Sequence, residues 1–266
     1  MKHTILTLSM ALTLLAVKGQ QKEGRVVYER TVQMQMRMMG GGNEMEQMMP
    51  RTRKDKLEVL FGNDQSLRRT LDDDVQEDMT AERGGMQVRM MIAGANDITY
   101  TDFSAGRTVE QREFGARNYI VADSIKKLNW KLTGETKTIL NYPCQQAVAQ
   151  RIGKRNITSM ENGELKNQEV ADTMNITAWF TLAVPVPAGP EYQGQLPGLI
   201  LAIDVNNGRV VYEAVALSPK VDIADIKAPS KGRKVTAEEF AQEREKVMKE
   251  MQRNGGGRGT TIRIGG

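Results

Sequence analysis

Histidine and cysteine are almost absent from this 266-residue chain: His3 is the only histidine and Cys144 is the only cysteine. No internal disulfide can form, and sites built from several imidazole or thiolate ligands, such as zinc and iron–sulfur centres, are disfavoured. If residues 1–19 are removed on export, as argued below, Ser-His-Asp and Cys-His nucleophile pairs are excluded as well. A lone cysteine is usually a small buried apolar residue, and we expect this of Cys144.

Neither sign of charge is in strong excess, and aromatic residues make up only 5% of the chain. Removal of Lys2 and Lys18 would lower the 37 Lys and Arg residues to 35, against 33 Asp and Glu residues. Proteins that bind nucleic acid usually combine a clustered basic face with stacking aromatic side chains. The sequence has neither feature, so we expect no nucleic-acid partner.

The longest apolar run lies at the N-terminus and has the three parts of a signal peptide. Lys2 gives a basic start, residues 5–17 are mainly apolar, and Val17 and Gly19 fit the small-residue rule of a cleavage site. The run is shorter than the roughly 20 apolar residues that a membrane span requires. We therefore expect residues 1–19 to be a signal peptide. The mature chain is then exported to the periplasm or the outer-membrane periphery and has no transmembrane segment.

Alternating apolar and polar residues predict that the mature chain is mainly β, a β-rich α+β protein. The predicted strands are 24–32, 56–61, 98–103, 106–113, 118–122, 130–132, 136–142, 144–152, 174–182, 199–205 and 209–217. Asn206, Asn207 and Gly208 predict a tight hairpin between the last two, because type I′ turns require positive φ at both central residues. Short strands at this spacing favour a curved antiparallel sheet or an open barrel.

One helix is predicted near the C-terminus. Thr236 and Glu239 form a capping box, in which each side chain bonds the backbone N–H of the other residue. The glycines that begin at Gly255 end the helix. After the signal peptide the chain therefore divides into four parts: a β-rich domain over 20–218, a charged linker over 219–235, a C-terminal helix over 236–254 and a disordered tail over 255–266.

Several motifs resemble the GLPGLI family of exported bacterial proteins, a family without an established biochemical activity. The motifs lie at 130–139, 142–147, 179–181, 189–190 and 196–201. The likeness extends over residues 24–250 and is most specific over 130–204. Gln195 stands where the naming motif has its first glycine. If that position needs a positive φ, Gly194 is the candidate to supply it.

A block rich in proline and glycine joins the aromatic strand at 174–182 to the next apolar strand. Its prolines restrict φ, whereas its glycines permit conformations that other residues avoid. The block is interpreted either as a structural corner or as the rigid rim of a site for an apolar ligand or an envelope protein. In the second interpretation the contact residues are Trp179, Phe180, Tyr192, Leu196 and Pro197.

Methionine is concentrated in residues 34–49, which hold seven of the 17 methionines of the chain. Thioethers suit Cu(I), and a Met-x-Met spacing on a glycine-bearing segment lets several sulfurs converge. A copper site in this segment would use Met34, Met36, Met38, Met45 and Met48. The alternative is a surface loop in which methionine serves only as a flexible apolar residue. No other cofactor is predicted.

Three hypotheses for function follow. The leading one is an exported, non-enzymatic envelope protein that binds an apolar ligand or a protein partner. The second is an extracytoplasmic Cu(I)-binding protein. The third is a hydrolase that uses carboxylates alone, and it predicts two acids in a cleft with at least one raised pKa.

Overall fold

The computed structural model describes residues 21–33, 52–71, 81–83, 86–88, 97–114, 117–161 and 164–254. Its elements in chain order are β1 (Gly24–Gln33), β2 (Thr52–Gly62), β3 (Gln65–Thr70), β4 (Ala81–Arg83), β5 (Met86–Val88), β6 (Ile98–Asp102), β7 (Arg107–Phe114), β8 (Arg117–Ser124), β9 (Lys131–Ile139), β10 (Tyr142–Glu161), β11 (Glu164–Thr181), β12 (Leu199–Val205), β13 (Val210–Ser218), the 3-10 helix η2 (Ile223–Asp225), β14 (Arg233–Val235) and α2 (Ala237–Asn254). Strands dominate, as the sequence predicted.

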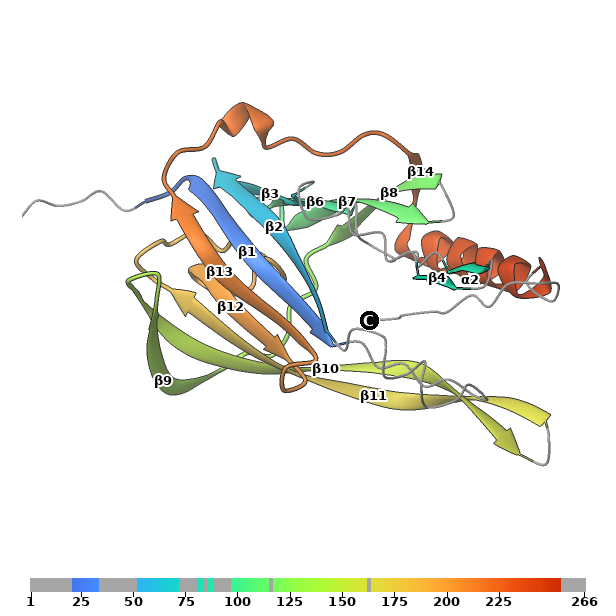
Figure 1. Ribbon diagram of the computed structural model, residues 1–266. Coiled ribbons are helices and arrows are strands. Elements are labelled where there is room, and N and C mark those ends of the chain that lie inside the picture. Colours follow the sequence, from blue (N-terminus) through green and yellow to red (C-terminus); the bar gives the residue numbers. More distant parts are fainter. Residues whose placement is uncertain are drawn as a thin grey trace, which may run out of the picture.

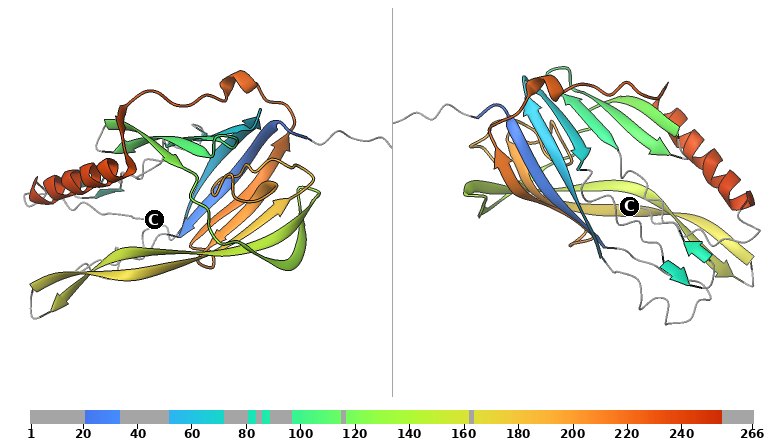
Figure 2. Two further views of the ribbon diagram at one scale, coloured as in Figure 1. Left: turned by 180° about the vertical axis from the view of Figure 1, so that it is seen from behind. Right: turned by 45° about the horizontal axis from the view of Figure 1, so that its top comes forward.

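Twelve strands form one open, curved sheet in the order β14-β8-β7-β6-β3-β2-β1-β13-β12-β11-β10-β9 (Figure 1). Neighbouring strands are antiparallel except for β14 and β8, which are parallel. The two edges of the sheet, β14 and β9, do not pair with each other, and the views in Figure 2 show the sheet open between them. β4 and β5 form a separate hairpin. The prediction of a curved antiparallel sheet is confirmed, and the sheet is not closed into a barrel.

Two short turns at positive φ were not predicted from the sequence. Asn63 and Asp64, at φ 51° and 58°, join β2 to β3, and Leu140 and Asn141, at φ 49° and 65°, join β9 to β10. Positive φ at both central residues is the arrangement that matches the twist of antiparallel strands. The strand predicted over 136–142 is therefore wrong in its last part, because the chain reverses at residues 140 and 141. The strand predicted over 144–152 is confirmed as part of β10.

The hairpin predicted at residues 206–208 is confirmed, although its loop is longer than a two-residue turn. Val205 pairs with Val210, so four residues separate β12 from β13. Asn206, Asn207 and Gly208 all have positive φ, at 53°, 53° and 89°. Neighbouring side chains stabilise this loop: the Asp204 carboxylate accepts from Gly208 N at 2.7 Å, and Asn206 Oδ1 accepts from Asn175 N at 2.8 Å.

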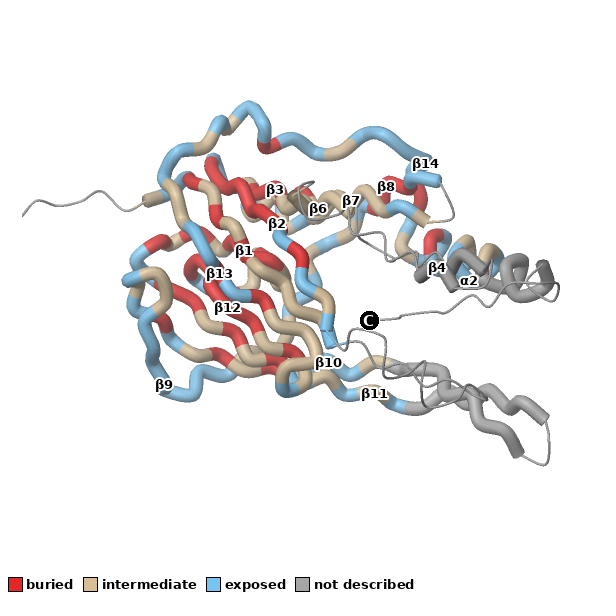
Figure 3. The backbone as a smooth tube through the Cα atoms, viewed as in Figure 1, coloured by how far each residue is buried: buried red, intermediate tan, exposed pale blue. Residues whose placement is uncertain are grey.

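The main core lies on the face of the sheet that carries Val26 and Tyr28, which we name the inner face. Apolar side chains of β1, β2, β11, β12 and β13 alternate onto this face, as the pleat of a strand requires. The loop at residues 182–198 packs across them and contributes buried Val184 and Leu196. Figure 3 shows the buried positions following β1, β2 and β12. The Tyr28 hydroxyl, buried at the centre, donates to the Ile200 carbonyl at 2.6 Å.

The linker at residues 219–235 covers part of the opposite, outer face. Its Ile226 is buried against Leu60, Leu67 and Tyr100, which point outward from β2, β3 and β6. The linker ends as β14, which adds to the edge of β8 (Figure 1). The segment predicted as a charged linker therefore also supplies apolar cover for the sheet.

Helix α2 begins at the predicted capping box. Glu239 N donates to Thr236 Oγ1 at 3.1 Å, and Thr236 N donates to the Glu239 carboxylate at 2.9 Å. Phe240 is buried against Tyr119 of β8, with the two rings edge to face at 5.3 Å between centroids. In the described part of the chain, no helix has both the length and the apolar character needed to span a membrane.

Candidate functional site

The loop at residues 182–198 is held in place by its own backbone hydrogen bonds. Gly194 N donates to the Pro187 carbonyl at 2.7 Å, and Leu199 N donates to the Val184 carbonyl at 3.0 Å. Ile200 N donates to the Ala188 carbonyl at 2.9 Å. With these bonds and the buried apolar side chains of the loop, the first β12 residues and the loop form one unit over the inner face. For the buried apolar residues of this loop, the interpretation as a structural corner is the one that applies.

The loop requires glycine at position 198, and it accommodates glutamine at position 195, where the family motif has its first glycine. A Cβ atom on Gly198 would lie 2.1 Å from the Thr181 carbonyl oxygen, so only glycine fits between the strands there. Gly194 has φ +76°, whereas Gln195 is not among the residues at positive φ. The Gln195 side chain instead accepts from Leu128 N at 2.9 Å and from Trp130 Nε1 at 3.1 Å.

The five contact residues predicted for a ligand or partner do not form one surface. Phe180 and Leu196 are buried in the main core, with exposed fractions of 1% and 4%. Trp179 alternates to the outer face, where Lys137 Nζ lies 4.4 Å from its ring centroid. Tyr192 packs edge to face on Trp130, and Pro197 is exposed. Phe180 and Leu196 therefore stabilise the loop from inside the core.

The five methionines predicted to bind Cu(I), within residues 34–49, lie outside the described residues. In the ranges that are described, no three His, Cys, Asp or Glu side chains gather as a metal site. The Cys144 thiol is buried, and burial raises its pKa. Cys144 is thus the small buried residue that its isolation in the sequence predicted.

Beyond the loop, the inner face carries a continuous series of charged side chains that the sequence did not reveal. We name it the charged band. It comprises Arg30 from β1, Arg53 and Asp55 from β2, Arg68 from β3, Asp97 before β6, Glu110 and Arg112 from β7, and Glu191 from the loop. The pairing register places the members on β1, β2, β3 and β7 on the inner side of neighbouring strands. Glu191 joins them through its contact with Arg68, and Asp97 through a hydrogen bond from Glu113 N.

Arg30 and Asp55 form a bidentate ion pair within the band. Arg30 Nε and Nη2 each donate to one Asp55 oxygen, both at 2.7 Å, in the bidentate geometry typical of guanidinium and carboxylate. The Asp55 side chain is only 1% exposed and that of Arg30 16%. Burial lowers the pKa of Arg30, but Asp55 and Tyr212 outweigh this effect and raise it overall, so the guanidinium stays charged.

A second pair joins the band to the loop. Arg68 donates to the Glu191 carboxylate and, at 3.0 Å, to the Pro190 carbonyl. The Tyr212 hydroxyl donates to the same Glu191 carboxylate at 3.2 Å. Burial and the nearby Glu191 charge raise the pKa of Tyr212, so its hydroxyl remains a donor. The loop is therefore anchored at Glu191 by two side chains of the sheet.

The far part of the band approaches α2. Arg112 pairs with Glu110, and its guanidinium lies 5.4 Å from the centroid of the Phe240 ring. The backbone N–H of Glu113 donates to the Asp97 carboxylate at 3.2 Å. Burial raises the pKa of Asp97, and Glu110 adds to this effect, whereas Arg112 and Arg68 act in the opposite direction.

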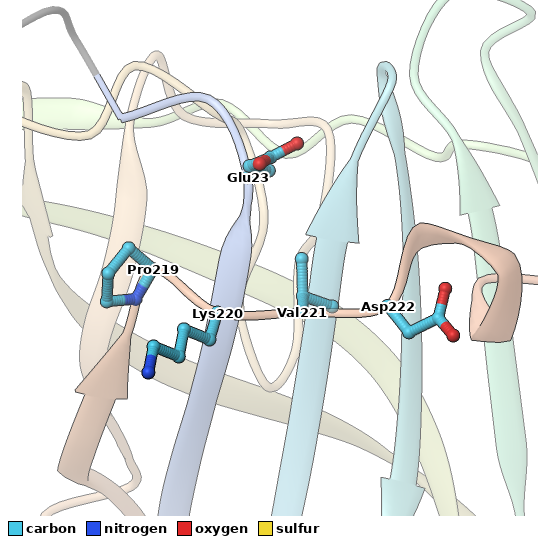
Figure 4. Close-up of a pocket in the computed structure, with 5 residues that line it drawn as sticks. All are labelled: Glu23, Pro219, Lys220, Val221 and Asp222. Atoms are coloured by element: carbon cyan, nitrogen blue, oxygen red, sulfur yellow. The ribbon is translucent and has the colours of Figure 1, made fainter.

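A shallow depression lies elsewhere, where β1 begins and β13 ends (Figure 4). It is lined by Glu23, Pro219, Lys220, Val221 and Asp222. Figure 4 shows that Lys220 and Asp222 point away from each other, so the charged groups do not converge on one point. The depression therefore lacks the enclosed shape and the convergent polar groups of a small-molecule site.

Of the comparisons with known proteins, the one with solved structures concerns the fold, and none indicates an activity. Residues 130–202 match a family described as "Protein of unknown function (Porph_ging)". This match is consistent with the GLPGLI resemblance, which was most specific over the same strands and loop. A comparison with curated proteins gave no match.

Two solved structures share the fold. The structure of PNGF-II in space group P21 is 14% identical, with a TM-score of 0.51, and the likeness covers 83% of this chain and 32% of that one. The structure of PNGF-II in space group C2 is 15% identical, with a TM-score of 0.51, over 84% of this chain and 33% of that one. This chain thus spans about a third of the length of PNGF-II. At such identities the likeness concerns the fold alone.

Proposed function

We propose that this chain is an exported, non-enzymatic binding protein of the bacterial envelope, in the periplasm or at the outer-membrane periphery, which engages a protein partner through the charged band. Export is supported by the three-part N-terminal segment at residues 1–19. The observation that carries the proposal is the division of the inner face. Its apolar half is filled by the loop at 182–198, and its other half presents partly exposed charged side chains in fixed geometry.

A protein partner fits this division better than an apolar ligand. An apolar ligand needs an apolar concave surface, and on the inner face the loop already occupies that surface with Val184, Val186 and Leu196. Charged side chains of alternating sign provide specificity and orientation at an interface between proteins. Their ion pairs within the band keep them ordered before binding, which reduces the entropy lost on association.

Native mass spectrometry of the protein purified from its own envelope tests the proposal. Arg112→Gln removes a charge from the band, and Arg69→Gln on the outer face is its matched control, since the two side chains are 37% and 43% exposed. We expect a bound protein with the wild type and with Arg69→Gln, and its depletion with Arg112→Gln. Equal amounts of bound partner in both variants, or no partner in the wild type, would contradict the proposal.

A carboxylate hydrolase is the second candidate, and one observation favours it. Asp97 has a raised pKa and is close enough to Glu110 for the charge of Glu110 to contribute to that shift. A raised pKa on one of two neighbouring acids is the arrangement that acid–base catalysis uses. Asp97→Asn should abolish hydrolysis in a screen of glycoside and peptide substrates. If neither the wild type nor Asp97→Asn hydrolyses any of them, the hydrolase interpretation fails.

A further inference from the structure

Strand β2 carries two arrangements of one carboxylate between two arginines, one on each face of the sheet. On the outer face, the buried Glu58 gives one oxygen to Arg25 and the other to Arg69, the second at 2.6 Å. Both arginines are well exposed to solvent, at 42% and 43%. Each guanidinium therefore has its own oxygen and is also hydrated, so the outer arrangement is complete.

The inner arrangement is not balanced in the same way. Arg30 occupies both oxygens of Asp55, at 2.7 Å each. Arg53 approaches Asp55 Oδ2 only to 3.4 Å, which is longer than the 2.7–2.9 Å of a charge-assisted hydrogen bond. Water compensates little, because the Arg53 side chain is 19% exposed. Within the described residues, Arg53 is thus a largely desolvated cation that shares an oxygen already bonded to Arg30.

The neighbouring carboxylate does not correct this imbalance. Glu191 accepts from Arg68 and from the Tyr212 hydroxyl. Within the described residues, the ion pairs of Arg30, Arg53 and Arg68 involve two carboxylates, those of Asp55 and Glu191. Of the three arginines, Arg53 forms only the long contact, to an oxygen that Arg30 already occupies.

We infer that Arg53, together with Arg30, forms a binding site for an oxyanion, a carboxylate or phosphate group carried by the ligand. A guanidinium presents paired N–H donors that match the two oxygens of such a group. Burial lowers the pKa of Arg53, against the effect of Asp55, and an added anion would offset that penalty. The inference rests on the proposed binding function and supplies the chemistry of one of its contacts.

The experiment uses small anions and requires no partner protein. The Nε–Hε resonance of Arg53 is followed by nuclear magnetic resonance while the full mature protein is titrated with inorganic phosphate or with glutarate, against chloride at the same ionic strength. We expect a saturating shift in the wild type and in the control Arg25→Gln. Calorimetry should show that Arg53→Gln weakens binding by roughly 10-fold or more, the size expected for one hydrogen bond to a charged group.

The outcomes separate the ligand sources and the two proposals. Binding of phosphate alone identifies a phosphate-bearing ligand, and binding of glutarate alone identifies a carboxylate-bearing one. An unmoved Arg53 resonance with both anions, or equal affinity in the wild type and Arg53→Gln, overturns the inference. If Arg53→Gln does not fold, the wild-type resonance decides. Anion binding without any partner in native mass spectrometry would contradict the proposed function and leave this site intact.

Discussion

Gly198 should be the least replaceable glycine of the loop, and the reason is a close approach of two backbones. A Cβ atom on residue 198 would lie 2.1 Å from the Thr181 oxygen and 2.8 Å from its carbonyl carbon. Carbon and oxygen atoms normally stay about 3.3 Å apart. In Gly198→Ala the two backbone segments must therefore separate by about 1.2 Å. No change of side-chain rotamer can relieve this clash, because the atoms of Thr181 that the Cβ would meet belong to the backbone.

The expected loss of stability follows from the hydrogen bonds and apolar contacts that this separation breaks. Leu199 pairs with Thr181 at the end of the β11–β12 ladder, and Leu199 N also donates to the Val184 carbonyl. Loss of two backbone hydrogen bonds costs about 2 kcal/mol, at about 1 kcal/mol each. Partial exposure of fully buried Leu199 and Ile200 adds about 1–3 kcal/mol. We expect Gly198→Ala to lower the free energy of unfolding by about 3–5 kcal/mol in total.

Urea denaturation monitored by circular dichroism measures this change, with Gly134→Ala as the matched control. Gly134 has φ +85°, but a Cβ there would meet no atom within 4 Å. The control therefore carries only the cost of a left-handed backbone, about 1–2 kcal/mol. If Gly198→Ala were no more destabilising than Gly134→Ala, the argument from close approach would be refuted. A changed slope against urea would instead indicate an altered unfolded or native state.

Three further predictions concern other parts of the molecule. Gln195→Gly restores the first glycine of the family motif and removes the part-buried acceptor of Leu128 N and Trp130 Nε1. It should destabilise the fold by about 1–3 kcal/mol and shift Trp130 fluorescence to the red; unchanged emission would count against it. Burial acts to raise the pKa of Glu58, but hydrogen bonds from Arg25 and Arg69 outweigh it and hold this pKa below its ordinary 4.5. The stabilisation from the Glu58 charge is therefore present above pH 4.5, and it is lost as the pH falls through the lower pKa of the folded state. Glu58→Gln should therefore show a shallower loss of stability below pH 4.5, and parallel curves for the two proteins would contradict this. If the segment at 34–49 binds Cu(I), replacing the five methionines at 34, 36, 38, 45 and 48 by leucine should abolish Cu(I) uptake and cost less than ~1.5 kcal/mol per site; equal uptake by both proteins would eliminate the copper hypothesis.

Local signals in the sequence predicted the elements whose residues are sufficient to specify them. The capping box at Thr236 and Glu239 is present as expected, because both partners lie within four residues of each other. The alternation around Val26 and Tyr28 indicated β1, since these two inward residues are apolar and fully buried. Strand β3 was missed because its inward residues, Ser66 and Arg68, are polar.

The charged band could not be predicted, because its members come from six separate segments between residues 30 and 191. Arg30 continues the inward positions of Val26 and Tyr28, but the sequence does not say that Asp55 lies opposite it. Only the register of β1 against β2 brings that pair together. Likewise, only the path of the loop at 182–198 brings Glu191 to Arg68.

By itself, the sequence determined the class of the fold, the C-terminal helix, the hairpin at Asn206 and the burial of Cys144, because periodicity, capping and turn chemistry act over a few residues. The tertiary structure decided which face of the sheet is filled and which remains charged. It also turned Phe180 and Leu196 from predicted contacts into core residues and gave Gln195 its two donors. These outcomes depend on contacts between segments far apart in the chain, and the spacing of residues along a sequence carries no information about them.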